Sequence, residues 1–285
     1  MMNSKRLHNL FGLKWNPFAT GVPVEGLYVT PALEDFLWKA ENVLASEGGF
    51  ALVSGDTGAG KSTTFRLLAQ RLAPLRDLRV GVISHPSSNL ADFYREMGEI
   101  FGVALKPHNR WCGFKALRES WQEHIDQLQM RPVLLIDEAQ ELPAAVLAEL
   151  RLLSSACFDS RILLTIVLAG DHRLSERLSA PEFLPIASRI RTRLVFPALP
   201  SETLQEYLCH LLAGAGNSKL MTPELIATVC AHSNGNLRSL TILGGELLDG
   251  AVQHEHSQID EKLFLEVTQA ASQATARPKS AKGRR

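Results

Sequence analysis

Residues 55–62 read Gly-Asp-Thr-Gly-Ala-Gly-Lys-Ser and lie between an apolar run, residues 50–54, and a helical pattern, residues 61–72. This octapeptide fits G-x-x-x-x-G-K-[ST], a loop that joins a strand to a helix and holds nucleotide phosphates. Glycines let the backbone turn its N–H groups around an anion, and the helix N-terminus adds its dipole. The alternative, a glycine-rich turn with a chance Lys-Ser pair, is disfavoured because both flanking elements are of the required type.

The side chains of this loop predict ATP and Mg²⁺ as ligands. We expect Lys61 to neutralise the β- and γ-phosphates and Ser62 to offer its hydroxyl to Mg²⁺. The nucleotide-binding residues predicted from the loop are Gly55, Asp56, Thr57, Gly58, Ala59, Gly60, Lys61, Ser62 and Thr63.

A second apolar run, residues 133–136, ends in two adjacent acids, Asp137 and Glu138. Such a pair places one carboxylate near the metal and the next near the γ-phosphate. We therefore expect Asp137 to hold Mg²⁺ and Glu138 to orient the attacking water, with Lys61 completing the catalytic set. Adjacent acids after a strand can also begin a loop or cap a helix, but the phosphate loop favours the catalytic interpretation.

Apolar segments alternate with helical patterns from residue 50 to residue 196, which predicts an α/β fold with a parallel sheet between helices. Five strands are expected, at residues 50–54, 79–84, 133–137, 162–170 and 193–196. Between them, helices are expected at residues 61–72, 90–101, 114–127 and 143–155. After residue 200 only helices are predicted, at 202–213, 223–232, from about 236 and from about 259, as a small C-terminal helical lid.

The expected organisation is an N-terminal segment (1–45), an α/β core (46–199), the helical lid (200–268) and a disordered basic tail (269–285). The 285-residue chain has no formal net charge, so bulk electrostatics do not indicate a nucleic-acid binder. No apolar run approaches the ~18 residues of a membrane span, and no secretory signal is evident, which predicts a cytoplasmic protein. The four cysteines form no Cys-x-x-Cys pair, which indicates reduced thiols.

Several further residues are candidates for sensing or completing the nucleotide site. Arg189 and, second, Arg191 precede the fifth strand, where this type of ATPase presents an arginine to a neighbouring subunit's nucleotide; a solvated basic edge or a DNA-contacting strip is the alternative. Arg238, in the first turn of a lid helix, is a candidate sensor of ATP. Asp171, after the fourth strand, stands where a polar residue often monitors the γ-phosphate, and its acidity favours holding water over phosphate.

Together these motifs resemble the ExeA branch of the AAA+ P-loop ATPases, whose transposon members include TniB, TnsC and MuB. The resemblance extends to about residue 268. Its carriers are Phe11-Gly12-Leu13, Asn16-Pro17-Phe18, the phosphate loop, Asp137-Glu138-Ala139-Gln140, residues 147–153, Val167-Leu168-Ala169-Gly170, Ser188-Arg189-Ile190 and Gly235-Asn236-x-Arg238. One departure is Gly170-Asp171-His172, where the branch usually has Gly-Gln-Pro.

The resemblance implies a nucleotide-dependent ring or helical filament of this chain, with Asn16, Pro17 and Phe18 near the adenine; an N-terminal packing staple is the alternative for these three. It also implies a grip on duplex DNA, independent of base sequence, through the segment after the second strand. The residues expected there are Lys106, Asn109, Arg110, Trp111 and Lys115; alternatively Trp111 packs locally while the charges face water.

The first functional hypothesis is an ATPase that regulates DNA transposition, with a transposase as partner, alone or together with a targeting protein. Secretion-type relatives continue into a membrane span and a cell-wall-binding region, whereas this chain ends in a basic tail, which favours the transposition branch. The alternatives are a protein-remodelling ATPase of envelope secretion and a nucleotide-switched signalling scaffold.

Overall fold

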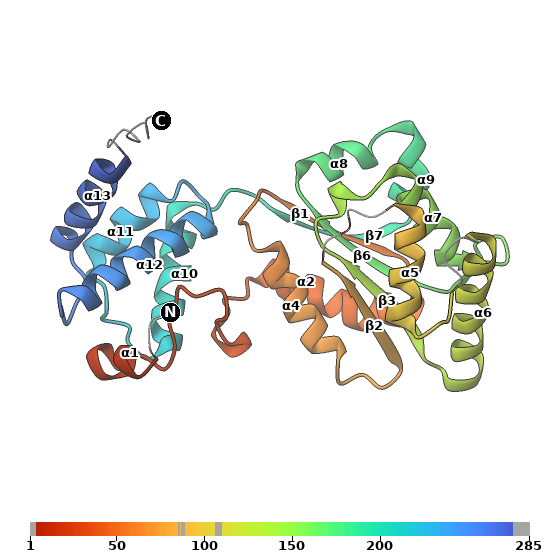
Figure 1. Cartoon of the computed structure of the whole chain (residues 1–285), viewed down its shortest axis with the longest axis horizontal. Coiled ribbons are helices and arrows are strands. Elements are labelled where there is room, and N and C mark those ends of the chain that lie inside the picture. The colour runs from red at the N-terminus through yellow and green to blue at the C-terminus, as the bar shows by residue number, and fades with distance from the viewer. Residues whose placement is uncertain (1–3, 85, 87–88, 106–109, 276–285) are drawn as a thin grey trace, which may run out of the picture. The chain divides into compact units, whose positions relative to one another are not determined.

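The computed structural model describes residues 4–84, 86, 89–105 and 110–275, which form two compact units (Figure 1). One unit, the α/β unit, comprises Val29–Pro197; the other, the helical unit, comprises Met1–Tyr28 and Ala198–Arg285. This division differs from the expected one at the N-terminus, because residues 1–28 group with the C-terminal helices. No helix of the described residues has the length and apolar character that crossing a membrane requires.

The α/β unit is built on five parallel strands in the order β2-β3-β6-β1-β7 (Figure 1). They are β1 (Phe50–Gly55), β2 (Leu78–Ile83), β3 (Arg131–Ile136), β6 (Thr165–Gly170) and β7 (Ile190–Phe196). Every residue of β6 is buried, as expected of a central strand covered on both faces. The predicted fold class is confirmed, and the fourth predicted strand begins three residues later than expected.

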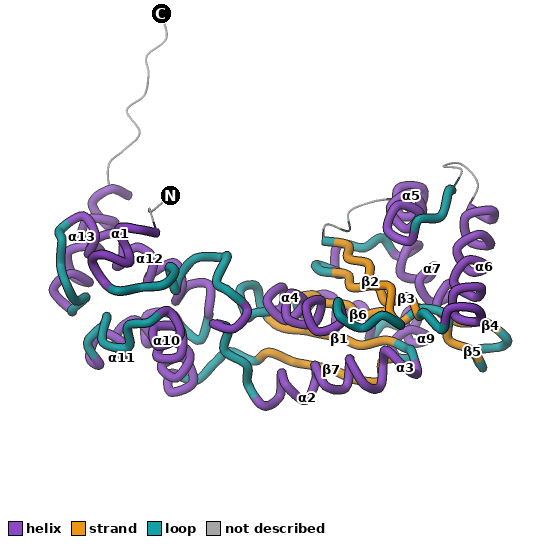
Figure 2. The backbone as a smooth tube through the Cα atoms, turned by 90° about the horizontal axis from the view of Figure 1, so that it is seen from below, coloured by secondary structure: helices purple, strands orange, loops and turns teal. Residues whose placement is uncertain are grey.

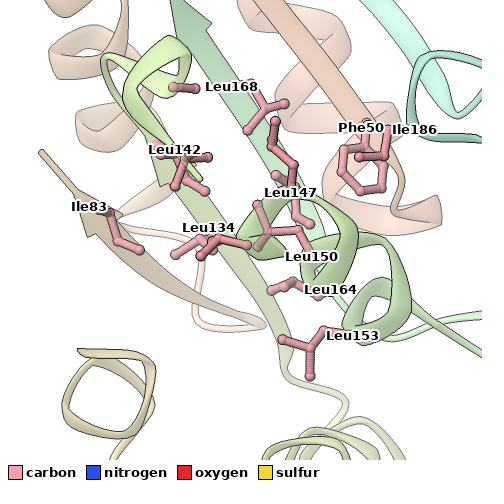
Figure 3. Close-up of a cluster of buried hydrophobic side chains, with 14 of the residues drawn as sticks. Phe50, Ile83, Leu134, Leu142, Leu147, Leu150, Leu153, Leu164, Leu168 and Ile186 are labelled. Carbon is pink, nitrogen blue, oxygen red and sulfur yellow. The ribbon is translucent and has the colours of Figure 1, made fainter. Parts of the chain in front are cut away.

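Side chains alternate between the two faces of the sheet, so each strand contributes to two cores. On one face Leu134 and Leu168 pack with Leu147 and Leu150 of a covering helix (Figure 3). The helices whose residues join this cluster are α5 (Leu90–Phe101), α6 (Arg110–Leu128), α7 (Ala144–Ser154), α8 (His172–Leu178) and α9 (Leu184–Ala187), with the short turns η3 (Ala139–Glu141) and η4 (Pro181–Phe183).

A second set of helices contacts the sheet from outside this cluster. Helix α4 (Lys61–Leu72) contacts β1, β2 and β6. Ahead of β1 lie α2 (Pro31–Lys39), η2 (Ala40–Leu44) and α3 (Ala45–Glu47), which were not predicted. In Figure 2, α2 runs along β7, the strand at one edge of the sheet.

A small antiparallel hairpin, β4 (Ser155–Ala156) and β5 (Arg161–Ile162), interrupts the chain between α7 and β6. Its turn contains three consecutive non-glycine residues in the left-handed region, Cys157, Phe158 and Asp159, with φ of 51°, 56° and 64°. Such conformations cost roughly 1–2 kcal/mol per residue. Phe158 at the tip is fully exposed.

The helical unit contains α1 (Ser4–Phe11), η1 (Val24–Gly26), α10 (Ser201–Ala215), α11 (Pro223–His232), α12 (Leu237–Gln253) and α13 (Glu261–Thr275). Leu7 and Phe11 of α1, four residues apart on one helix face, are buried in the same cluster as Leu208. This apolar packing is why the N-terminal residues group with the helices. Helix α13 extends seven residues into the tail that was predicted to begin at residue 269, and residues 276–285 lie outside the described part of the chain.

Candidate functional site

The strand register brings the predicted chemical groups of the α/β unit together at the carboxyl ends of the strands. Strands β1, β6 and β3 are adjacent and parallel, with Ser54 opposite Gly170 and Ile136 opposite Leu168. Their carboxyl ends therefore lie together, the usual position for a ligand in a parallel α/β sheet. The phosphate loop, Asp137 and Asp171 each follow one of these ends.

The phosphate loop has the backbone geometry that the glycines of its sequence predict. Gly58 and Gly60 have φ of 84° and 105°, in the region that side chains disfavour. At Gly55 a Cβ would approach the Cβ of Phe196 to 2.7 Å, so a side chain here would collide with strand β7. The loop leads directly into α4, and the dipole of a helix N-terminus favours an anion at this place.

Lys61 carries an ammonium group that is almost completely buried. The residue is 5% exposed, and its Nζ donates to the carbonyl oxygens of Gly55 (2.8 Å) and Asp56 (3.0 Å). No ion pair joins it to any carboxylate of the described residues. A buried cation requires compensating negative charge, so this arrangement fits a phosphate group as the counter-ion.

The residues predicted to hold Mg²⁺ are of the right chemical kind. Ser62 is exposed in the first turn of α4, and Asp137 follows the last residue of β3. The Asp137 N–H donates to the carbonyl of Ile83 (2.9 Å), and its Oδ1 accepts the N–H of Glu138 (2.9 Å). A hydroxyl and a carboxylate suit Mg²⁺, which combines few protein ligands with phosphate oxygens.

Glu138 is held in place by a residue that the sequence analysis had not singled out as functional. The Gln140 Nε2 donates to Glu138 Oε2, and the Gln140 Oε1 accepts the N–H of Asp171 (3.2 Å). Glu138 itself is exposed and adopts a left-handed backbone conformation, φ 51° and ψ 38°, which starts the short turn η3. The signal for Gln140 in the sequence is the tetrapeptide Asp137-Glu138-Ala139-Gln140, which places the amide two residues after the second acid.

Asp171 caps helix α8. Its Oδ1 accepts the backbone N–H of Arg173 (2.9 Å), and its Oδ2 accepts the Arg173 Nε (2.9 Å), while Arg173 also pairs with Glu141 (2.9 Å). Burial raises the pKa of the Asp171 carboxyl, but the hydrogen bonds and charge of Arg173 outweigh it and lower the pKa below its ordinary value. Asp171 therefore lies directly after β6, as predicted, and its carboxylate accepts hydrogen bonds at the start of α8.

Arg189 and Arg191 lie at the opposite edge of the sheet from the phosphate loop. The Arg189 carbonyl accepts the N–H of Phe50, the first residue of β1 (3.3 Å). The Arg189 side chain pairs with Asp159 of the hairpin turn, and Arg191 pairs with Glu47 (2.6 Å). Hydrogen bonds from Ser155 and Arg189 lower the pKa of Asp159. Both arginines line a cavity of about 400 Å³, together with Gly49, Phe50, Ser154, Ser155, Asp159, Ile162 and Ser188.

The remaining nucleotide candidates belong to the helical unit. Asn16 Oδ1 accepts the N–H of Phe18 (2.9 Å), and the Phe18 ring fills the space where Gly244 lacks a side chain. Arg238 is exposed in the first turn of α12, whose N-cap Asn236 accepts the N–H of Arg238 (2.9 Å). The packing of Phe18 agrees with the staple interpretation, and the adenine and sensor roles stay predictions.

Of the residues predicted to contact DNA, Lys106 and Asn109 lie outside the described residues. Arg110 begins α6 and pairs with Glu149 of α7, at 2.5 Å between Nη2 and Oε2. Glu149 is 2% exposed and also accepts the hydroxyl of Tyr94. Arg110 therefore neutralises a buried carboxylate.

Trp111 is 70% exposed, and its ring stacks on Phe114 with 5.8 Å between centroids. The Arg118 guanidinium lies 5.0 Å from the centroid of Phe114. Lys115 is exposed and lies 3.6 Å from Glu119. Trp111 thus packs locally on Phe114 while most of the residue is exposed, and its contact with DNA stays a prediction.

Comparison with known proteins agrees with this geometry. Residues 44–178 match the family model described as an AAA domain. The chain is 30% identical over 237 residues to general secretion pathway protein A of Aeromonas hydrophila, a match that covers 82% of this chain. The match spans 42% of the relative, less than half of its length.

Solved structures with the same fold are more distant in sequence. Cdc6p of Pyrobaculum aerophilum aligns with a TM-score of 0.70 at 14% identity, covering 92% of this chain and 74% of that one. Drosophila ORC bound to DNA aligns with a TM-score of 0.66 at 20% identity, covering 92% and 65%. These likenesses show an AAA fold and no more.

Proposed function

Because the chain carries an AAA-type ATPase domain, we propose that it hydrolyses ATP in an assembly of its own copies and uses the cycle to remodel a protein partner in envelope secretion. The ATPase part rests on one observation, the buried Lys61 ammonium above a glycine loop, without a carboxylate partner among the described residues. The secretion part rests on the similarity to general secretion pathway protein A, which runs over 82% of this chain.

The proposed chemistry assigns each group of the sheet edge one task. The N–H groups of the loop and the Lys61 ammonium bind the β- and γ-phosphates, and Ser62 and Asp137 hold Mg²⁺, which supplies charge neutralisation at the phosphate oxygens when bound. Glu138 orients the water that attacks the γ-phosphate and accepts its proton. Phosphoryl transfer depends mainly on such positioning and charge stabilisation.

Arg189 completes the site only from a second copy. Strand β1 separates the Arg189 backbone, beside Phe50, from the phosphate loop that starts at Gly55. Six residues of a strand span roughly 20 Å, which is longer than an arginine side chain. We therefore propose that Arg189 stabilises the transition state in a neighbouring subunit, with Arg191 as the second choice.

The ATPase part is tested by comparing the wild-type protein with Glu138→Gln. We expect the wild type to release phosphate from ATP, and the variant to bind ATP with unchanged affinity while turning over about 100-fold or more slowly. The variant keeps the phosphate-binding loop, so it should accumulate as an ATP-bound assembly in size-exclusion chromatography. Normal turnover by Glu138→Gln would contradict the role of the carboxylate.

The secretion part needs an experiment in the source organism. Lys61→Ala at the chromosomal locus should reduce the amount of secreted protein in the culture medium, because an ATPase that cannot bind ATP cannot drive its partner. Lys39→Ala, which removes an exposed lysine paired with Asp35, is the matched control. Unchanged secretion by Lys61→Ala would remove this part of the proposal.

DNA binding with a role in transposition is the second candidate, favoured by the exposed Trp111 with the exposed Lys115 four residues further along α6. One structural neighbour, Drosophila ORC, is bound to DNA. A sequence-independent grip predicts ATP-dependent binding to random duplex DNA that weakens steeply with salt. Trp111→Ala should reduce it, whereas Trp38→Ala, at another exposed tryptophan, should not. No ATP-dependent binding at low salt would exclude this candidate.

A further inference from the structure

We infer that Gln140 is a positioning residue for hydrolysis, which fixes the Glu138 carboxylate to the end of strand β6 through the N–H of Asp171. This inference rests on the proposed ATPase function. It deepens that function, because it assigns the orientation of the water-activating carboxylate to a side chain outside the phosphate loop.

The two hydrogen bonds of the Gln140 amide define which way it faces. A backbone N–H can only donate, so the group that lies 3.2 Å from the Asp171 nitrogen must be the carbonyl oxygen Oε1. The amide nitrogen Nε2 then faces Glu138 and donates to its Oε2. The opposite orientation would place a donor against a donor and an acceptor against a carboxylate, so the bridge can form in one way only.

Strand β6 ends in a residue that leaves room for this amide. At Gly170 a Cβ would lie 2.7 Å from the Gln140 Oε1 and 2.6 Å from Leu174 Cδ2. Gly170 is buried and has an ordinary strand backbone, so its role here is the space that it leaves open. Gly170 therefore leaves the space through which the Gln140 amide links the end of β3 to the end of β6.

Glu138 needs such a bridge because little else confines it. The side chain is exposed, and the residue begins a turn in which the buried Ala139 anchors the backbone and directs Gln140 towards β6. An exposed carboxylate samples several rotamers. Donation from Gln140 to one carboxylate oxygen restricts this sampling and leaves the second oxygen for water. Small displacements of a reacting group reduce rates strongly, by about 10²-fold for about 1 Å.

The test is the steady-state and single-turnover hydrolysis of ATP by Gln140→Ala in the full chain. We expect kcat to fall about 10- to 100-fold, with the affinity for ATP unchanged, because the phosphate loop is untouched. Gln140→Glu retains the size of the side chain but cannot donate to Glu138, and it should lose as much activity. Gln127→Ala, which removes a comparable exposed Gln–Glu bond on α6, is the control and should keep full activity.

A double-mutant cycle distinguishes positioning from a general structural effect. If Gln140 acts through Glu138, then Gln140→Ala should cause no further loss in single-turnover rate when Glu138 is already Gln. An equal additional loss in that background, or an unchanged or increased rate in Gln140→Ala alone, would overturn the inference. A wild-type protein that fails to hydrolyse ATP would instead refute the proposed function.

Discussion

The Lys61 side chain does not stabilise the nucleotide-free fold, because its charge is buried against two neutral carbonyl groups. Lys61→Met should therefore abolish ATP binding without lowering the melting temperature of the nucleotide-free protein. Binding to the folded state raises the melting temperature of the wild type in ATP·Mg²⁺, and that rise should vanish in the variant. Thermal scans with and without ATP check both points. A melting temperature well below that of the nucleotide-free wild type would indicate a structural role for the ammonium.

Arg110 stabilises the fold although its own side chain is exposed, because it pairs with the buried carboxylate of Glu149. Removing Arg110 leaves a carboxylate that is 2% exposed without its cation. We expect Arg110→Ala to lower the free energy of unfolding by about 2–3 kcal/mol, since an uncompensated buried charge is costly. Lys115→Ala, at an exposed pair on the same helix, should change it by less than about 0.5 kcal/mol. Urea unfolding measures both, and Glu149→Leu should reduce the effect of Arg110→Ala. Equal small effects of the two single variants would contradict this role.

The residues expected in the nucleotide site could be predicted from the sequence because each has a local reason to be there. Lys61, Asp137 and Glu138 follow from spacing and from the apolar runs that precede them. The partners of Gln140 at Asp171 and of Arg189 at Asp159 could not be identified in the same way. Asp171 lies 31 residues from Gln140, and Asp159 lies 30 residues from Arg189. Such pairs depend on strand order and on a turn, neither of which leaves a periodic signal.

The turn of the β4–β5 hairpin holds Arg189, the arginine proposed to act on a neighbouring subunit, through an ion pair. The Asp159 carboxylate pairs with Arg189, so the guanidinium must leave this partner before it can reach another subunit's phosphate. Asp159→Asn retains a residue that tolerates the left-handed backbone and removes the charge. Arg189 then no longer has to leave an ion pair before it reaches the neighbouring subunit, so the ATPase rate at subsaturating protein concentration should rise. Because an exposed ion pair contributes little free energy, we expect an increase of about two- to fivefold. Asp126→Asn, which removes the pair with Arg161, is the control. A lower rate in Asp159→Asn would mean that the pair orients Arg189 for its task.

Most elements were predictable because their periodicity is long enough to recognise. Helices α4 and α5 have the predicted ends, since the phosphate loop precedes one and Asn89 caps the other. The hairpin was missed because two-residue strands have no alternation to detect, and residues 157–159 contain no glycine to signal a left-handed turn. The helices ahead of β1 were missed as well, although Thr30 and Pro31 mark the start of α2.

In the proposed assembly, an Arg189 that acts only on a neighbouring subunit makes hydrolysis depend on contact between copies, and mixed variants test this dependence. Each single variant, Lys61→Ala and Arg189→Ala, should be about 10³-fold less active than wild type. Mixing them should restore activity, because an Arg189→Ala subunit has a complete loop and a Lys61→Ala neighbour supplies the arginine. If an equal mixture assembles at random, about a quarter of the interfaces combine an intact phosphate loop with an intact Arg189 from the neighbour. We therefore expect about a quarter of wild-type phosphate release. A mixture no more active than the two variants apart would show that Arg189 does not act across an interface. Mixing Lys61→Ala with Glu138→Gln provides the negative control, since neither subunit can then complete a site.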